Sequence, residues 1–311
     1  MADVSAGSYL QSPAAAVSLT LTLGCLGWAW LDPASLTTAE IWIFGVSMLL
    51  TGLPHGATDH VVYQAIRREQ DRPVRWDYFF GGYLLAILLY ALLWIWIPAG
   101  SMLIFLGISA WHFGQSQYQH LRGSAQDPMI AFLYLSWGTL ILLALLTAHP
   151  ASVAHIVSDW LPLLPEVTGI RTGLVLGLGG IYISLLALCV WRAQLSLRQA
   201  AIEVLFTLLL LGIFEAVPLL VGFALYFGGW HAPASMQAEI QHLRMQQPDF
   251  GLRQFVRAAW PLTLISVVGI GMLLVIGQYW PALSPFLLLF IAVSALTLPH
   301  LVVMHRLYEQ T

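Results

Sequence analysis

The sequence contains no lysine, and only 9% of its 311 residues are charged. Soluble domains of average composition carry about 25% charged residues, so a soluble globular protein is excluded. Two cysteines are too few for a disulfide scaffold or a thiolate metal cluster. The net charge of −3 offers no basic surface to nucleic acid. The chain is instead 59% hydrophobic and has ten histidines beside twelve arginines, which indicates a histidine-rich integral membrane protein.

Long apolar runs divide the chain into candidate membrane spans. A helix needs about 20 mostly apolar residues to cross the hydrocarbon layer. Runs of this kind fall at residues 14–31, 41–66, 78–97, 101–120, 129–148, 170–190, 200–214, 217–237, 260–278 and 285–305. They predict an all-α, polytopic membrane helix bundle with about ten spans, eight or nine being the alternatives. No stretch between the runs is long enough for a second domain, so residues 1–311 are expected to form a single domain.

The arginines support an even number of spans. Eleven of the twelve fall in loops on one predicted side of the membrane, and Arg171 is the exception. Loops on the other side carry acidic residues, among them Asp159, Glu166 and Glu215. Because basic residues accumulate in cytoplasmic loops, both termini are expected to be cytoplasmic.

Six of the ten histidines lie within predicted spans or at their ends. All six lie on even-numbered spans, and four of them lie 11 to 15 residues from the predicted outer ends: His55, His112, His231 and His300. At about 1.5 Å per residue, the four share one depth to within about 6 Å. A single intramembrane histidine is equally well explained by a hydrogen bond to a backbone carbonyl. Four at a common depth, on helices that run in one direction, predict a metal site.

The type of metal follows from the ligands that are available. Imidazole nitrogens suit zinc, copper, iron and nickel. An all-nitrogen site with vacant positions suits ferrous iron, Fe(II), that binds dioxygen. A bis-histidine haem or a zinc hydrolase stays open at this point, although the chain has no HExxH pair.

Polar residues near the histidine layer are candidates for supporting the metal. Asp59 follows His55 by four residues, on the same helical face. It either accepts a hydrogen bond from a metal ligand or pairs with His60 or Arg67. The candidate supporting groups and alternative ligands in these spans are Asp59, His60, Gln115 and His305. The remaining four histidines are expected to be solvated: His120, His149, His155 and His242.

Aromatic residues also gather near this depth. They are candidates for lining a slot for a long apolar substrate, although aromatic residues at helical spacing are commonly plain packing. The candidates are Trp111, Phe113, Tyr226, Phe227 and Trp230.

Four segments of the chain resemble the Brp/Blh family of β-carotene 15,15'-dioxygenases. The segments are Leu53-Pro54-His55-Gly56-Ala57-Thr58-Asp59-His60, Trp111-His112-Phe113-Gly114, Tyr226-Phe227-Gly228-Gly229-Trp230-His231 and Leu298-Pro299-His300. The resemblance runs from about residue 40 to the C-terminus. It implies a multi-pass enzyme of the bacterial inner membrane that uses iron and dioxygen to cleave the central double bond of β-carotene, a lipid-dissolved substrate. The product would be retinal, often destined for a microbial rhodopsin.

The resemblance also implies which residues bind the iron. Histidines in the first three segments are regarded as ligands in the family, which corresponds here to His55, His112 and His231. The family often has another histidine four residues after the third of these, where this chain has Ser235. We therefore expect His300 as the fourth ligand because of its depth, with His60 as the alternative and Ser235 as a supporting group.

Two other classes of protein stay open. A membrane di-metal oxygenase of the desaturase or hydroxylase type would carry HxxHH clusters, but this chain has no two adjacent histidines. A transporter or channel with an intramembrane histidine site would need polar residues on both sides of the histidine layer. The outer halves of the even-numbered spans are almost wholly apolar, which argues against it.

Overall fold

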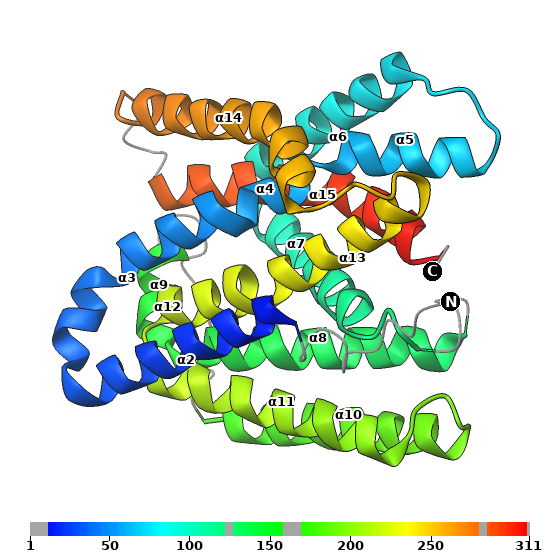
Figure 1. Ribbon diagram of the computed structural model, residues 1–311. Helices are drawn as coiled ribbons and strands as arrows, with labels where there is room; N and C mark the ends of the chain where they lie inside the picture. The colour runs from blue at the N-terminus through cyan, green and yellow to red at the C-terminus, as the bar shows by residue number, and fades with distance from the viewer. Residues whose placement is uncertain (1–11, 122–126, 158–168, 280–284, 310–311) are drawn as a thin grey trace. The chain divides into compact units, whose positions relative to one another are not determined.

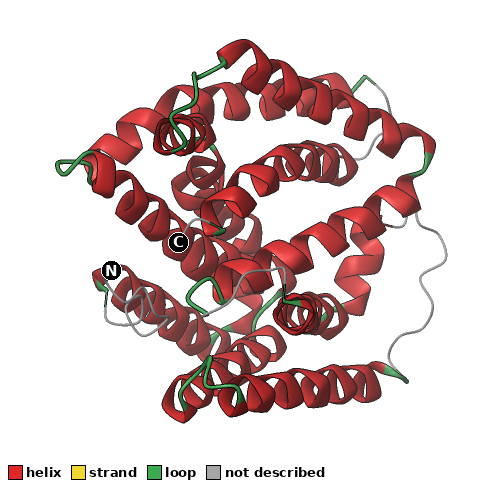
Figure 2. Ribbon diagram, turned by 90° about the vertical axis from the view of Figure 1, so that its right-hand side faces the viewer, coloured by secondary structure: helices red, strands yellow, loops and turns green. Residues whose placement is uncertain are grey.

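A computed structural model describes residues 12–121, 127–157, 169–279 and 285–309, and these residues form helices without any strand (Figures 1 and 2). The first part of the chain contains α2 (Pro13–Leu31), α3 (Pro33–Ser47), the π-helix η1 (Met48–Gly52), α4 (Leu53–Gly56), α5 (Asp59–Glu69), α6 (Trp76–Trp96) and α7 (Pro98–Gln117). The middle part contains α8 (Pro128–Ala148), α9 (Pro150–Val157), α10 (Arg171–Trp191) and α11 (Leu197–Ala216). The last part contains α12 (Leu219–Phe223), the π-helix η2 (Ala224–His231), α13 (Ala232–Gln246), α14 (Leu252–Gly277) and α15 (Pro285–Tyr308).

Eight helices in the described part of the chain are long and apolar enough to cross a membrane. They are α2, the stretch Pro33–Glu69, α6, α8, α10, α11, α14 and residues Leu287–Tyr308 of α15. This confirms the predicted all-α membrane helix bundle. The other two predicted spans correspond to α7 and to the stretch from α12 into α13, so the count of ten stays a prediction.

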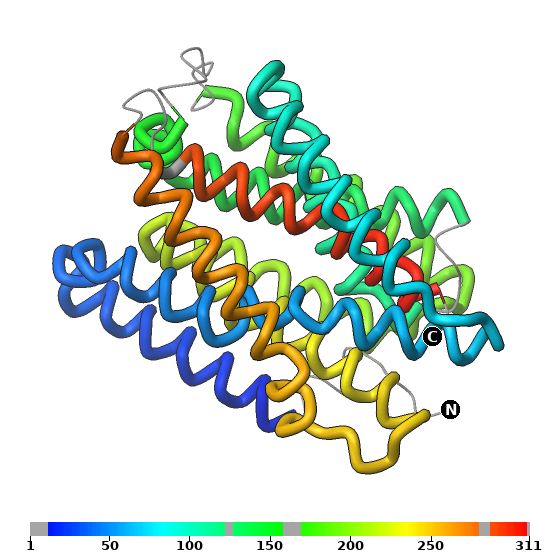
Figure 3. Tube along the Cα trace, turned by 90° about the horizontal axis from the view of Figure 1, so that it is seen from above, coloured from blue at the N-terminus to red at the C-terminus, as the bar shows by residue number. Residues whose placement is uncertain are grey.

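Short capping sequences fix where several helices begin. Ser12, Asp32 and Asp127 each precede a proline, and each accepts a hydrogen bond from a backbone N–H in the first turn of α2, α3 or α8. A side-chain acceptor before the helix and a proline at its first position are the preferred start of an α-helix. Because only Asp32 separates α2 from α3, the two helices form a tight hairpin, which is drawn in blue in Figure 3.

The chain divides into two compact units, each built from separate stretches. Unit 1 comprises Met1–Gly52, Ser109–Val153 and Pro165–Gln237, and unit 2 comprises Leu53–Ile108, Ala154–Leu164 and Ala238–Thr311. The prediction of a single domain stays a prediction.

The core of unit 1 is built around α8. This helix packs against α10, α11 and α12, and 12 of its 21 residues are buried. It also meets the second half of α7 backbone to backbone. A Cβ atom added at Gly114 would overlap the carbonyl of Tyr134, and one added at Gly138 would overlap the carbonyl of Ala110. Small residues that let backbones approach closely are typical of helix pairs in membranes.

The core of unit 2 is built around α15. This helix packs against α5, α6 and α14. Its buried cluster with α5 consists of Val62, Ile66, Val303, Met304, Leu307 and Tyr308. Trp94 of α6 donates from Nε1 to the Ser294 hydroxyl of α15 over 2.8 Å, so a polar contact accompanies the apolar packing.

The helix predicted around His55 is interrupted. It passes from α3 through η1 into α4, ends at Gly56, and resumes as α5 at Asp59. At this break the Thr58 hydroxyl lies 3.2 Å from the carbonyl oxygen of His55, and threonine hydroxyls near backbone groups compete with helix continuation. The prediction that His55 and Asp59 lie on one continuous helical face is therefore wrong.

The one arginine on the predicted outer side has an acidic partner. Arg171 at the start of α10 forms an ion pair with Glu215 near the end of α11 and donates from Nε to Thr147 over 3.1 Å. Glu215 had been predicted on the same side, so this pair is consistent with the predicted topology. Three other residues used in that prediction, Arg122, Asp159 and Glu166, lie outside the described residues.

Candidate metal centre

Unit 2 brings together two of the four predicted ligands. His55 on α4 and His300 on α15 are both buried, and their rings meet edge to face with centroids 4.5 Å apart. The two Nε2 atoms are 2.9 Å apart. The histidines are separated by 245 residues in sequence, so their contact brings the first and last motifs together in the fold.

Each of these histidines presents its other nitrogen to a buried carboxylate. His300 Nδ1 lies 2.8 Å from Asp59 Oδ1, and His55 Nδ1 lies 3.1 Å from Glu239 Oε1. An ionised carboxylate only accepts hydrogen bonds, so beside such a group each Nδ1 would be the donor. The two Nε2 atoms lie 2.9 Å apart, within hydrogen-bond distance, and the tautomers of the two rings decide which one donates. Nitrogens turned toward one another in this way are also suitably placed to bind a metal ion.

Further hydroxyl groups hold the two carboxylates. Thr58 donates to Glu239, and Tyr83 on α6 donates to Asp59 Oδ2 over 3.0 Å. Both carboxylates are almost completely buried. Buried charges are tolerated only when they are paired and hydrogen-bonded, and partners that orient ligating histidines are the usual surroundings of a metal. The donor set therefore fits a metal ion.

Glu239 is a residue that the sequence reasoning missed, because the predicted span ended two residues before it. The helix actually continues through α13 to Gln246. Along α13 the polar residues Ser235, Glu239, His242 and Gln246 recur at spacings of four, three and four. This spacing places the four side chains on one face of a helix. It is the sequence pattern from which a buried role for Glu239 could have been predicted.

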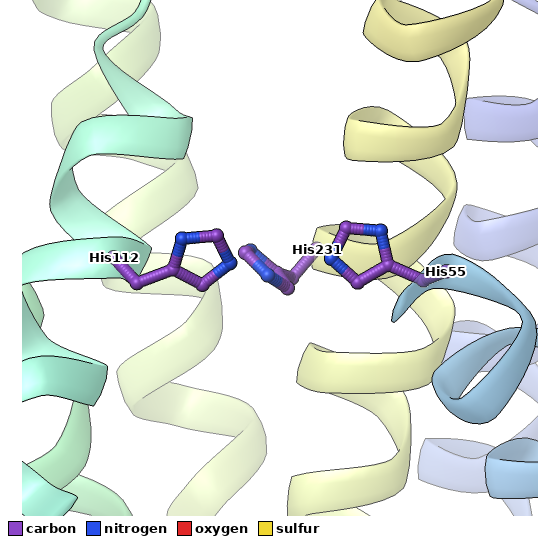
Figure 4. Close-up of side chains that lie close together, drawn as sticks. All are labelled: His55, His112 and His231. Atoms are coloured by element: carbon purple, nitrogen blue, oxygen red, sulfur yellow. The ribbon is translucent and has the colours of Figure 1, made fainter. Parts of the chain in front are cut away.

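Unit 1 brings together the other two predicted ligands. His112 on α7 and His231 at the end of η2 are both buried, and their rings stand at 80° with centroids 5.0 Å apart (Figure 4). Figure 4 shows the two rings turned toward each other.

Three of the five predicted aromatic residues surround His231. Phe227 stacks on its ring at 5.5 Å, Phe113 meets it edge to face at 4.8 Å, and Tyr226 lies at 6.2 Å. The two tryptophans have other neighbours. Trp111 meets Tyr134, whereas Trp230 meets Phe206 and donates to Thr22 over 3.1 Å.

The remaining predicted supporting residues lie in varied surroundings. Ser235 is buried, and its hydroxyl lies 2.9 Å from that of Ser116. Gln115 is buried on α7, whereas His60 on α5 is half-buried. His305 Nε2 lies 3.3 Å from Glu309 Oε1 near the end of α15. Asp59 pairs with His300, and neither His60 nor Arg67 takes that place.

One histidine that was predicted to be solvated is buried. His242 lies on α13 with 2% of its surface exposed, and its Nε2 is 3.6 Å from Glu69 Oε1. Burial lowers the pKa of its imidazole. The prediction failed because the segment was treated as a loop, whereas α13 packs this face inward.

Comparison with known proteins identifies the family. The sequence model of the β-carotene 15,15'-dioxygenase family matches residues 46–308. A curated relative, the β-carotene 15,15'-dioxygenase of uncultured marine bacterium 66A03, is 27% identical over 287 residues, which cover 86% of this chain and 94% of the relative. No solved structure matches the chain. Since the matched residues include all four predicted ligands and most of the chain, the protein belongs to the β-carotene 15,15'-dioxygenase family.

Proposed function

We propose that the protein is an iron-dependent enzyme of the bacterial inner membrane that cleaves the central double bond of β-carotene to give two molecules of retinal. Addition of one dioxygen molecule across one carbon–carbon double bond yields two aldehydes, so no proton and no further reductant is consumed. Both termini are cytoplasmic on this proposal. The substrate enters from the lipid, and retinal leaves toward a retinal-binding protein of the microbial rhodopsin type.

The observation that carries the proposal is the pair of facing Nε2 atoms on His55 and His300. Each Nδ1 atom lies within hydrogen-bond distance of a buried carboxyl group, so Nε2 is the nitrogen of each ring that would face a metal ion. We assign His55, His112, His231 and His300 as the iron ligands, and Asp59 and Glu239 as the groups that orient two of them. Iron bound by imidazoles would supply the activation of dioxygen.

The chain's other contribution is to position a long apolar molecule and to exclude water. The aromatic rings of Phe113, Tyr226 and Phe227 lie around His231. We propose that they, with Trp111 and Trp230, lie along the substrate. An apolar polyene gains free energy from leaving water but little from moving between lipid and an apolar site. Shape and ring contacts, rather than burial, would therefore select which double bond lies beside the metal.

The proposal is tested by expressing the protein in a bacterium that accumulates β-carotene. We expect the pigment to be bleached while retinal appears, at about two molecules for each β-carotene lost. The matched control is the double variant His112→Ala/His231→Ala, which should leave the pigment intact. Unchanged pigment with folded, iron-loaded wild-type protein would refute the proposed substrate. Aldehydes of unequal length would refute cleavage at the central bond.

Removing the Asp59 carboxylate should weaken iron binding. The Asp59→Ala variant leaves His300 Nδ1 without its acceptor, so the ring is free to rotate and to change tautomer. Loss of such an orienting group typically lowers metal affinity about 10- to 100-fold. Iron affinity is measured by competition with a chelator. The control is Asp77→Ala, which removes an exposed carboxylate of α6 that forms an ion pair with Arg75 at the surface. Equal iron affinity in the two variants would contradict the role of Asp59.

A further inference from the structure

Two π-helices stand directly before two of the proposed ligands. η1 covers Met48–Gly52, three residues before His55, and η2 covers Ala224–His231, so that it ends on a ligand. π-Helices are rare, and single π-turns inside α-helices are frequently found at functional sites. The two segments also pack against each other within unit 1.

A π-turn determines where the following side chains point. It holds one residue more than an α-turn, and each residue of an α-helix rotates the chain by about 100°. If η2 changed from π-helical to regular α-helical geometry, its turn would hold one residue fewer. The side chain of His231 would then point about 100° away from its present direction. The direction of this ligand therefore depends on whatever holds η2 in the π form.

Hydroxyl groups from neighbouring helices bind the carbonyl groups of η2. Ser47 at the end of α3 donates to the carbonyl of Ala224 over 3.2 Å. The Thr51 hydroxyl of η1 lies 2.8 Å from the carbonyl oxygen of Gly228 and 2.9 Å from that of Ser47, so its single proton is shared between two acceptors. Ser18 of α2 donates to the carbonyl of Gly229. Backbone groups without partners are costly within a membrane. These donors consequently stabilise a backbone whose own hydrogen bonding is irregular.

The contact is also close in space. A Cβ atom added at Gly228 would overlap the Ser47 hydroxyl and would lie 3.0 Å from the Thr51 hydroxyl. A Cβ atom added at Gly52 would lie 3.1 Å from the ring of Phe227, which stacks on His231. Glycine at these two positions thus lets η1 and η2 approach each other. The contact between η1 and η2 therefore depends on close packing as well as on hydrogen bonds.

We propose that Thr51 and Ser47 are positioning residues for the metal ligand His231. They hold η2 in its π form through the carbonyls of Gly228 and Ala224, and they thereby aim the imidazole. This inference rests on the proposed function, because it takes His231 to be an iron ligand. It adds two hydroxyl-bearing residues, 180 and 184 positions upstream of His231, that act through the backbone of η2.

The test compares iron release from Thr51→Val, Thr51→Ser and wild-type protein to an excess of chelator. Valine has the shape of threonine without the hydroxyl, whereas serine keeps the donor. We expect release about tenfold faster from Thr51→Val, as for other groups that orient ligands, and near-normal release from Thr51→Ser. The electron paramagnetic resonance signal of the ferrous–nitric oxide adduct should change in Thr51→Val alone. The matched control is Thr38→Val on the exposed side of α3, where the Thr38 hydroxyl donates to the carbonyl of Ala34 in its own helix.

The outcomes separate positioning from general stabilisation. A structural role alone would lower the unfolding temperature of Thr51→Val and leave the spectrum of its bound iron unchanged, which would overturn the proposal. Equal release from the valine and serine variants would overturn it too. If Thr51→Val does not fold, Ser47→Ala must show the same spectral change, and an unchanged spectrum there refutes the proposal. Absence of iron from wild-type protein would instead refute the proposed function, and the positioning role with it.

Discussion

The His300→Ala variant is expected to lose at least nine-tenths of its bound iron. Removing this ring takes away one proposed ligand, and it also leaves the buried carboxylate of Asp59 without its strongest partner. Loss of a group that only orients a ligand already costs about 10- to 100-fold in metal affinity. Loss of the ligand itself should cost more. Activity against β-carotene should fall in parallel with iron content.

Iron content per folded protein is measured by elemental analysis after purification in detergent. The matched control is His155→Ala, which removes an exposed histidine of α9. His242→Ala is a poor control, because His242 is buried and its removal would leave a cavity. Equal iron in the His300→Ala and His155→Ala proteins would show that His300 is not the fourth ligand. His60 would then be the next candidate to replace.

The Gly138→Ala variant is expected to give little folded protein. The added methyl group would overlap the carbonyl of Ala110, so α7 and α8 would have to move apart. Overpacking of a core typically costs about 1–3 kcal/mol and occasionally more. The cost here should lie at or above the upper end, because the obstacle is backbone rather than a flexible side chain. His112 follows Ala110 on α7, so any protein that does fold should bind iron less tightly.

This expectation is checked by the yield of monodisperse protein and by its unfolding temperature. The control is Gly177→Ala on α10, where nothing lies within 4 Å of the added Cβ atom. That variant should resemble the wild type in yield, unfolding temperature and iron content. If Gly138→Ala matched it in all three, the close approach of α7 and α8 would be wrong.

Hydropathy and charge were enough to predict the class of fold. Sparse charge and repeated apolar runs predicted an all-α membrane bundle. Eight of the ten predicted runs each overlap one helix, whereas the runs 41–66 and 217–237 each cover several helical elements. These signals are local, because each depends on about 20 consecutive residues. Because these signals are local, they place the four candidate ligands in spans but do not show which residues each ligand contacts. His55 and His300 are 245 residues apart, and nothing in either neighbourhood encodes that they meet.

The errors near the site have a common physical origin. Regular helical spacing predicts that Asp59 lies on the same face as His55. The helix breaks at Ala57 and Thr58, and Asp59 pairs with His300 instead. Glu239 and His242 lie beyond the end of the predicted span at residue 237, whereas the helix itself continues to Gln246. A local break or a π-turn alters the direction of every side chain that follows it, while it leaves the hydropathy of the segment unchanged.

The sequence by itself determined that this protein is a membrane helix bundle, that six of its ten histidines lie within predicted spans or at their ends, and which family it resembles. Only the tertiary structure decided that His55 and His300 turn their Nε2 atoms toward each other, since that depends on carboxylates from α5 and α13 that occupy the Nδ1 atoms. Only the tertiary structure placed Ser47 and Thr51 on the carbonyls of η2. Composition and periodicity specify which residues are buried, whereas helix crossings and irregular turns specify which buried residues meet.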